Sequence, residues 1–201
     1  MFRSLVYDSL ILRMTARWYA AVLERLPPGA HLLDVGIGTG GALLANADTV
    51  AKKDLTVTGV DIDADYIDRA RRQLAASALS SRVTVHLRSV YDHTGEPCDA
   101  VYFSGSFMLL PDPVGALRHC AGLLRPGGRI YFTQTIQLRP SPVLERLKPA
   151  LRRVTSIDFG HVTYEDDFRA QLDTAGLRLE EWAVLELHGS RAACLAVASP
   201  K

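Results

Sequence analysis

Hydrophobic and polar residues follow two different periods along this chain, and the changes between them mark the predicted elements. Short apolar or alternating runs predict strands at 32–35, 55–61, 82–88, 99–104 and 129–136. Apolar positions with helical spacing predict helices within 1–28 and at 41–51, 63–78, 112–124 and 163–176. Two further runs, 177–187 and 192–198, flank a turn at 188–190 and predict a hairpin.

Strands that alternate with helices predict an α/β fold. The order of the elements predicts a doubly wound sheet of seven strands, mostly parallel, that ends in an antiparallel C-terminal hairpin. With 201 residues, the chain suits one domain, 1–201. Within it, residues 1–28 are expected to form a lid helix. The stretch 137–162, which three prolines interrupt, is expected to be a substrate-side insert.

A dense glycine cluster follows the first predicted strand. That strand contains Asp34, and Gly36, Gly38 and Gly40 follow it before a helical pattern begins. A strand, a glycine turn and a helix let the backbone approach a nucleotide closely, because a Cβ at the turn would block the ligand. The spacing satisfies both the dinucleotide pattern GxGxxG and the pattern DxGxGxG, so the glycines alone do not choose between two classes of cofactor.

Two acids near this cluster carry more information. Asp61 ends the second predicted strand, where a carboxylate accepts hydrogen bonds from ribose hydroxyls in either class. Asp34 lies two residues before the first glycine. A carboxylate there can hold an ammonium group or its water shell, and NAD carries no such group. Asp34 therefore favours a cofactor with an amino acid part.

Four segments in the right order resemble motifs of the class I S-adenosyl-L-methionine (SAM)-dependent methyltransferases. They are Leu32–Gly40, Gly59–Asp63, Cys98–Phe103 and Leu124–Phe132, and they span most of residues 30–135. The resemblance implies a Rossmann-like form of the predicted sheet, with SAM as the cofactor. It also implies a set of cofactor-binding residues: Asp34, Gly36, Gly38, Gly40, Asp61, Ile62, Ser89, Val90 and Ser104.

Some of these assignments depart from the family pattern. Ser89 stands where the family often has an acid after the third strand, and it is expected to accept a hydrogen bond from the adenine amine instead. Val90 or Tyr91 is then expected to cover the ring. Ser104 follows the fourth strand, where the family faces the transferable methyl group. Asp34 is placed near the methionyl amine.

The acceptor side is predicted from fewer signals. Tyr7, Tyr19 and Phe107 are expected to line the substrate site, since aromatic faces attract cationic groups. His161, in the insert, is the candidate catalytic base. The expected reaction is O- or N-methylation of a small-molecule or lipid-like acceptor. Two alternatives stay open: a catalytically silent SAM-binding partner subunit, and an NAD-dependent oxidoreductase, for which no Tyr-x-x-x-Lys or comparable hydride-transfer pair is present.

Composition narrows the partners. The formal net charge is +1, and no basic aromatic groove follows from the sequence, so nucleic acid is not expected as a substrate. The three cysteines form no C-x-x-C pair, so no metal site is expected. No apolar run reaches the roughly 18 residues of a membrane span, which favours a soluble, cytoplasmic protein. The arginines of segment 1–28 leave peripheral membrane contact open, and the oligomeric state is not predicted.

Overall fold

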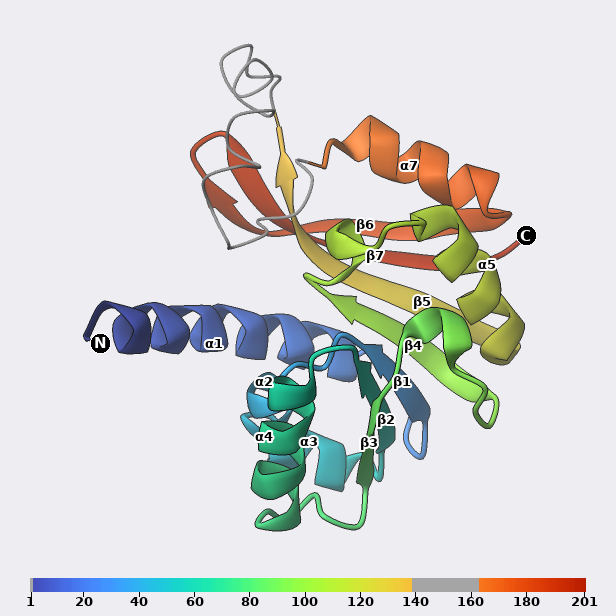
Figure 1. Cartoon of the computed structure of the whole chain (residues 1–201). Helices are drawn as coiled ribbons and strands as arrows, with labels where there is room; N and C mark the ends of the chain where they lie inside the picture. The colour runs from blue at the N-terminus through green and yellow to red at the C-terminus, as the bar shows by residue number, and fades with distance from the viewer. Residues whose placement is uncertain (1, 139–162) are drawn as a thin grey trace.

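The computed structural model describes the backbone of residues 2–138 and 163–201, with side chains from residue 11 onward in the first range (Figure 1). The described residues contain a seven-stranded sheet in the order β3-β2-β1-β4-β5-β7-β6. The strands are β1 (His31–Val35), β2 (Thr56–Asp61), β3 (Val83–Leu87), β4 (Cys98–Ser104), β5 (Leu124–Gln137), β6 (Leu177–His188) and β7 (Arg191–Pro200).

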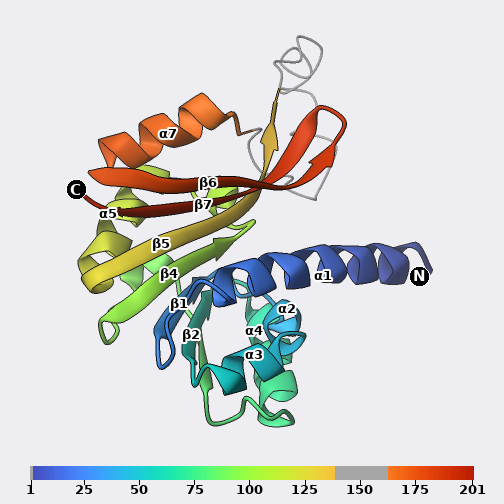
Figure 2. The same cartoon turned by 180° about the vertical axis from the view of Figure 1, so that it is seen from behind.

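Helices cover both faces of this sheet (Figures 1 and 2). They are α1 (Phe2–Leu23), α2 (Gly41–Leu44), α3 (Ala47–Lys52), α4 (Ala64–Ala75), α5 (Pro113–Leu123) and α7 (Glu165–Thr174), with short 3-10 turns η1 (Val90–Asp92) and η2 (Phe107–Leu109). Strands β1 to β5 pair in parallel, whereas β7 pairs antiparallel with β5 and β6. The predicted doubly wound sheet with its C-terminal antiparallel hairpin is confirmed.

Each face of the sheet has its own apolar core. On one face, Val57 and Tyr102 of the sheet pack with Leu23 of α1 and Ile67 of α4. On the other face, α5 and α7 cover a core rich in aromatic side chains. There Phe103 and Phe132 stack with ring centroids 5.4 Å apart, and Phe107, Phe168 and Trp182 surround them. Each such ring pair contributes about 0.5–1.5 kcal/mol beyond its buried area.

Helix α1 brings the N-terminal segment to the carboxyl end of β1 and β4. Its residues Trp18, Tyr19, Val22 and Leu23 are buried, and the Tyr19 ring meets the Tyr102 ring edge-on with centroids 4.9 Å apart. Its first half extends past the sheet in both views (Figures 1 and 2). No described helix is long and apolar enough to cross a membrane. The lid role predicted for residues 1–28 stays a prediction.

Two predicted boundaries differ from the structure. The helix expected at 41–51 is two short helices, because Asn46 interrupts it. The Asn46 Nδ2 donates to the carbonyl oxygens of Ala42 at 2.8 Å and Ala16 at 3.0 Å, which ties the break to α1. Strand β5 begins at Leu124, five residues before its predicted start, because Leu124 already pairs with Cys98 across a bulge.

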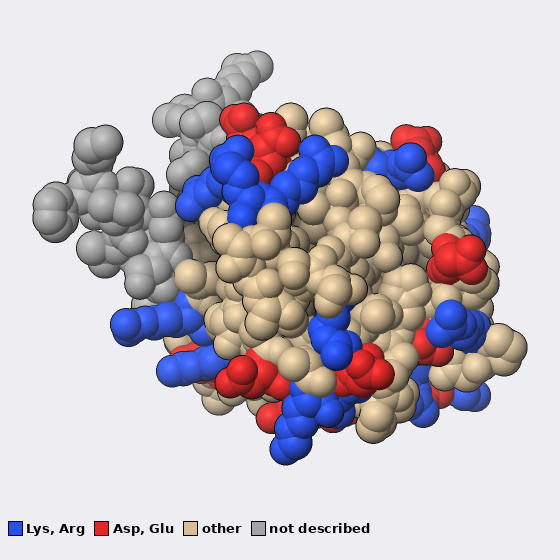
Figure 3. Space-filling model, turned by 90° about the horizontal axis from the view of Figure 1, so that it is seen from below, with Lys and Arg blue, Asp and Glu red and all other residues tan. Residues whose placement is uncertain are grey.

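Charged side chains of both signs lie mainly around the rim of the face of the molecule seen in Figure 3, and its centre holds few of them. Lysine and arginine lie beside aspartate and glutamate around its rim, in keeping with the net charge of +1. Within the described residues, no group of three or more His, Cys, Asp or Glu side chains is placed to hold a metal ion. The prediction that nucleic acid is not a partner is not tested by this distribution and stays a prediction.

Candidate functional site

The glycine turn after β1 uses backbone conformations that glycine alone adopts easily. Gly36, Gly38 and Gly40 have φ values of 79°, 59° and 72°. A Cβ on Gly36 would lie 2.5 Å from the Ser106 Cβ, so this glycine permits close packing of the loop after β4. A Cβ on Gly38 would meet nothing within 4 Å. The turn is therefore packed at Gly36 and open at Gly38, on the side where a ligand can lie.

The two glycines give a matched pair of substitutions. Gly36→Ala should destabilise the fold by about 2–4 kcal/mol. The new Cβ would clash with the Ser106 Cβ, and alanine would also be strained at this positive φ. Gly38→Ala carries only the strain and should cost about 1 kcal/mol. Urea unfolding of both variants checks this difference. Equal losses of stability would contradict the packing described for Gly36.

Asp61 connects the end of β2 to the glycine turn. Its Oδ2 accepts from the Gly38 N–H at 2.8 Å, and its Oδ1 accepts from the Asp63 N–H at 3.0 Å. Each carboxylate oxygen retains a lone pair for a further donor. The next side chain, Ile62, is 77% exposed. An acid followed by an exposed apolar side chain beside an open glycine turn forms a shelf for a ligand that has both hydroxyls and a flat ring.

Asp34 is the buried charge of the site. Its side chain is 0% exposed, and its Oδ2 accepts a 2.7 Å hydrogen bond from the Tyr19 hydroxyl of α1. Its Oδ1 has no hydrogen-bond partner among the described residues. Burial raises the pKa of Asp34 to about 7, the Tyr19 hydrogen bond opposes this, and the nearby Asp61 adds to it. The free oxygen is a vacant acceptor that a cationic donor would satisfy.

The loop after β4 closes the other side of the turn. Ser106 donates a hydrogen bond from its hydroxyl to the Val35 carbonyl oxygen, which fixes this loop against the end of β1. Ser104 is half-buried at the last position of β4. The Trp18 ring of α1 lies 3.6 Å from the place of a Cβ on Gly105. Ends of β1, β2 and β4 thus meet at one edge of the sheet, with α1 above them.

The predicted cofactor residues gather at this edge to different degrees. Ser89 is half-buried and caps η1 by accepting from the Tyr91 N–H at 3.4 Å. Val90 is 4% exposed and packs in the core, so its side chain offers little surface to an adenine ring. The glycines, Asp34, Asp61, Ile62 and Ser104 lie at the edge as expected.

The predicted substrate residues do not form an open pocket. Tyr19 and Phe107 are each 2% exposed, because Tyr19 is held by Asp34 and Phe107 belongs to the aromatic core, so neither presents a surface to an acceptor. Tyr7 lies in α1, in the part of the helix for which only the backbone is described. His161 and the rest of 139–162 lie outside the described residues, so the catalytic prediction stays a prediction.

Sequence reasoning missed two contacts of this site. The bond between Tyr19 and Asp34 joins positions 15 residues apart, and nothing in the sequence pairs them. The contact of Ser106 with Val35 depends on the approach of two loops, which no local pattern contains. For Tyr19 a signal existed, since a tyrosine on the apolar face of a helix needs a buried partner for its hydroxyl.

The comparisons with known proteins agree with this geometry. A family model described as a methyltransferase domain matches residues 32–128. The ubiquinone biosynthesis O-methyltransferase of Vibrio parahaemolyticus serotype O3:K6 is 35% identical over 108 residues, which cover 52% of this chain and 43% of that protein. The protein of the same name from Xanthomonas axonopodis pv. citri is 31% identical over 163 residues, 77% of this chain and 65% of that protein. The chain thus spans 43% of the Vibrio protein and 65% of the Xanthomonas protein, less than two thirds of either.

Solved structures match the fold over almost the whole chain. The [4+2]-cyclase SpnF has a TM-score of 0.75 at 19% sequence identity. The match covers 92% of this chain and 81% of the SpnF chain. The geranyl diphosphate C-methyltransferase from Streptomyces coelicolor, solved with S-adenosyl-L-homocysteine, has a TM-score of 0.72 at 15% sequence identity. The match covers 94% of this chain and 79% of that protein. At these identities the structures establish the fold. The family model and the curated relatives support the assignment of this chain to the class I SAM-dependent methyltransferases.

Proposed function

We propose that this chain binds SAM at the glycine turn and transfers its methyl group to an oxygen or nitrogen of a small-molecule or lipid-like acceptor. The observation that carries the proposal is the pairing of an open turn at Gly38 with a fully buried Asp34 whose Oδ1 has no described partner. A buried polar atom without a partner costs about 1–3 kcal/mol, and more when it is charged. A cationic ligand group would remove that cost.

The residues at this edge fit the parts of SAM one by one. Asp34 would hold the ammonium of the methionine part through its free Oδ1, and Asp61 would accept from the ribose hydroxyls through its remaining lone pairs. Ile62, which is 77% exposed, would lie against the adenine ring. The open side of Gly38 leaves room for the backbone of the turn to approach the ligand.

When bound, SAM supplies a methyl group on a sulfonium, an activated carbon that needs no further activation by the protein. The chain's own task is then to hold the acceptor in line and to exclude water. The loop from Ser104 to Ser106 is fixed by the Ser106 hydrogen bond to Val35, so it forms a rigid wall beside the turn. A proton leaves the acceptor as the new bond forms, and His161 is our candidate to accept it.

The relatives support oxygen as the acceptor atom, since the matched curated proteins are named O-methyltransferases. The NAD alternative gains no support, because NAD carries no ammonium group that could donate a hydrogen bond to Asp34. A silent SAM-binding subunit has one supporting observation, the burial of Tyr19 and Phe107, which leaves fewer described side chains to recognise an acceptor.

Transfer can be tested with SAM that carries a labelled methyl group. The protein is incubated with a panel of small phenols, catechols, hydroquinones and amines, and the products are read by mass spectrometry. We expect one labelled methyl group on a hydroxyl-bearing member, and no product with Asp61→Ala under the same conditions. SAM binding without any product across the panel would favour the silent subunit.

A further inference from the structure

A second concave site lies on the sheet face opposite α2, α3 and α4. The chain crosses from β3 to β4 through residues 88–97, whose only regular element is the three-residue turn η1. The crossover therefore supplies no α-helix to this face of the sheet, whereas α4 covers the opposite face. The loop 93–96 instead borders a groove of about 270 Å³.

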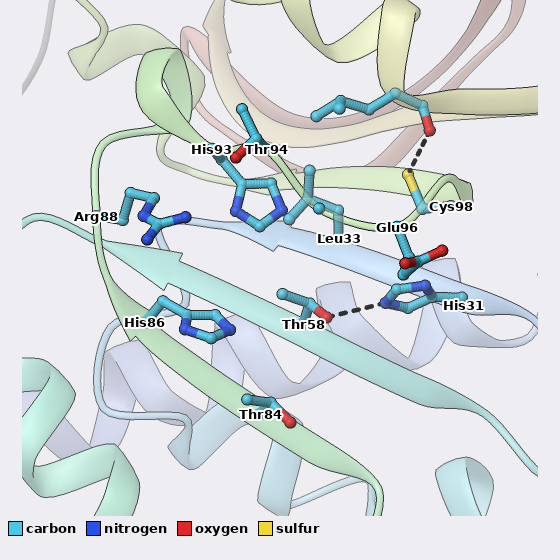
Figure 4. Close-up of a pocket in the computed structure, with 12 residues that line it drawn as sticks. His31, Leu33, Thr58, Thr84, His86, Arg88, His93, Thr94, Glu96 and Cys98 are labelled. Atoms are coloured by element: carbon cyan, nitrogen blue, oxygen red, sulfur yellow. Dashed lines mark hydrogen bonds between the residues drawn. The ribbon is translucent and has the colours of Figure 1, made fainter.

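The strands place polar side chains on the side of the groove and apolar side chains on the opposite side. Thr58, Thr84 and His86 point to the groove side, while their neighbours Val57 and Val85 are buried on the other side. Figure 4 shows that His31 lies at one end of the groove and His86 and Arg88 at the other. None of the groove residues belongs to the glycine turn, and neither Asp34 nor Asp61 lines it.

His93 is the key side chain of the groove. It is only 5% exposed, and its Nδ1 has no hydrogen-bond partner among the described residues. The His93 ring points into the groove, with its centroid 6.4 Å from that of His86 (Figure 4). Its carbonyl oxygen accepts from the His119 Nε2–H at 2.8 Å, which anchors the backbone to α5. A buried, anchored imidazole with a free nitrogen needs a partner that enters from the groove.

The surrounding charges indicate which partner fits. Arg88 is exposed at the same end of the groove and forms no ion pair with another described residue. Burial lowers the pKa of His93, and the nearby His86 and Arg88 lower it further, so Arg88 supplies the positive charge here and His93 offers a neutral ring. At the other end of the groove, the His31 Nε2 already has a hydrogen-bond partner, the Thr58 hydroxyl, at 2.9 Å.

We propose that this groove is a second ligand site, separate from the SAM site, for a small molecule that carries a phosphate-like anionic group. The anion lies between Arg88, His86 and His93, and accepts from the guanidinium and from the His93 Nδ1–H. The organic part extends along Thr84 and Thr58, whose hydroxyls hydrogen-bond it. The groove is near the lower end of the roughly 300–1,000 Å³ range of ligand pockets, so it suits a small metabolite.

The test follows the imidazole resonances of the ¹⁵N-histidine-labelled protein during titration with sodium sulfate and with glycerol phosphate. We expect saturable shifts of His93 and His86, with glycerol phosphate binding more tightly than sulfate because its hydroxyls reach the threonines. Arg88→Gln should weaken both affinities at least about tenfold, since it removes a charge-assisted contact. Arg72→Gln, an exposed arginine on α4, is the matched control and should change neither.

A separate titration of Arg88→Gln with S-adenosyl-L-homocysteine controls for the fold. Only the side chain changes, and the backbone N–H of residue 88 still donates to the Asp61 carbonyl oxygen, so this affinity should match wild type. Shifts that rise without saturation, or that persist in Arg88→Gln, would overturn the proposal. Equal affinity for sulfate and glycerol phosphate would overturn the claim that the groove holds the organic part.

Discussion

Asp34→Asn is expected to weaken cofactor binding by about ten- to a hundredfold, because a hydrogen bond to a charged group contributes about 1.5–3 kcal/mol. The asparagine oxygen can still accept from Tyr19, so the local packing should survive. In wild type the affinity should also fall as the pH decreases below about 7, because the carboxyl of Asp34, whose pKa is about 7, becomes neutral. Isothermal titration calorimetry with S-adenosyl-L-homocysteine from pH 5.5 to 8 measures both effects.

The same substitution should make the ligand-free protein more stable at alkaline pH. The folded-state pKa of Asp34 lies above its unfolded value of 3.8. Its contribution to the free energy of unfolding is therefore fully present below pH 4 and is lost as the pH rises to about 7. The raised pKa corresponds to a loss on the order of 4 kcal/mol. Chemical unfolding at pH 5 and pH 8 should show the part of this loss that falls above pH 5, about 2–3 kcal/mol, in wild type and not in Asp34→Asn.

Tyr19→Phe is the matched control for the charge of Asp34. It keeps the ring against Tyr102 and removes only the hydroxyl that lowers the Asp34 pKa. The pH at which affinity falls should move upward, while Asp34→Asn should show no such midpoint. The other titratable groups that act on Asp34 are Asp61 and Tyr102, and neither variant alters them. An unchanged midpoint in Tyr19→Phe would contradict the coupling between α1 and the site.

Asp61→Ala is expected to reduce cofactor affinity at least about tenfold, since it removes a charged acceptor for the ribose hydroxyls. It also removes the acceptor of the Gly38 N–H, so the turn loses one of its restraints. Asp63→Ala is the control. Asp63 caps α4 by accepting from the N–H groups of Asp65 and Tyr66, so its loss should cost about 1 kcal/mol of stability. The cofactor affinity measured by calorimetry should be unchanged in Asp63→Ala. An equal loss of affinity in both variants would mean that the loss comes from damage to the fold and not from a lost contact with the ribose.

The fold could be predicted because local signals and the global arrangement agree. Apolar or alternating strand runs, glycine turns and capped helices follow one another along the chain, and parallel strands joined by helices form a doubly wound sheet. Asp63 and Asp112 cap the helices that follow them, as their positions before helical patterns predict. The break at Asn46 was missed because it depends on a hydrogen bond to the carbonyl oxygen of Ala16 in α1, which no local pattern contains.

In the candidate site, too, local sequence signals predicted some residues, whereas others depend on tertiary packing. Glycine spacing and strand ends located Asp34 and Asp61, because those positions follow from the order of the chain. The substrate roles of Tyr19 and Phe107 stay predictions, and both side chains are buried here, since an aromatic residue near a strand end can face either the core or a ligand. Their burial depends on how α1 and η2 pack. The histidine groove was missed for a similar reason, because it depends on the short crossover between β3 and β4.

The central claim is that the glycine turn, Asp34 and Asp61 form a SAM site. Isothermal titration calorimetry of the wild-type chain with S-adenosyl-L-homocysteine and, separately, with NAD tests this claim most directly. The account predicts one site of micromolar affinity for S-adenosyl-L-homocysteine, an accompanying rise in melting temperature by mass action, and no binding of NAD. Binding of NAD without binding of S-adenosyl-L-homocysteine would contradict it.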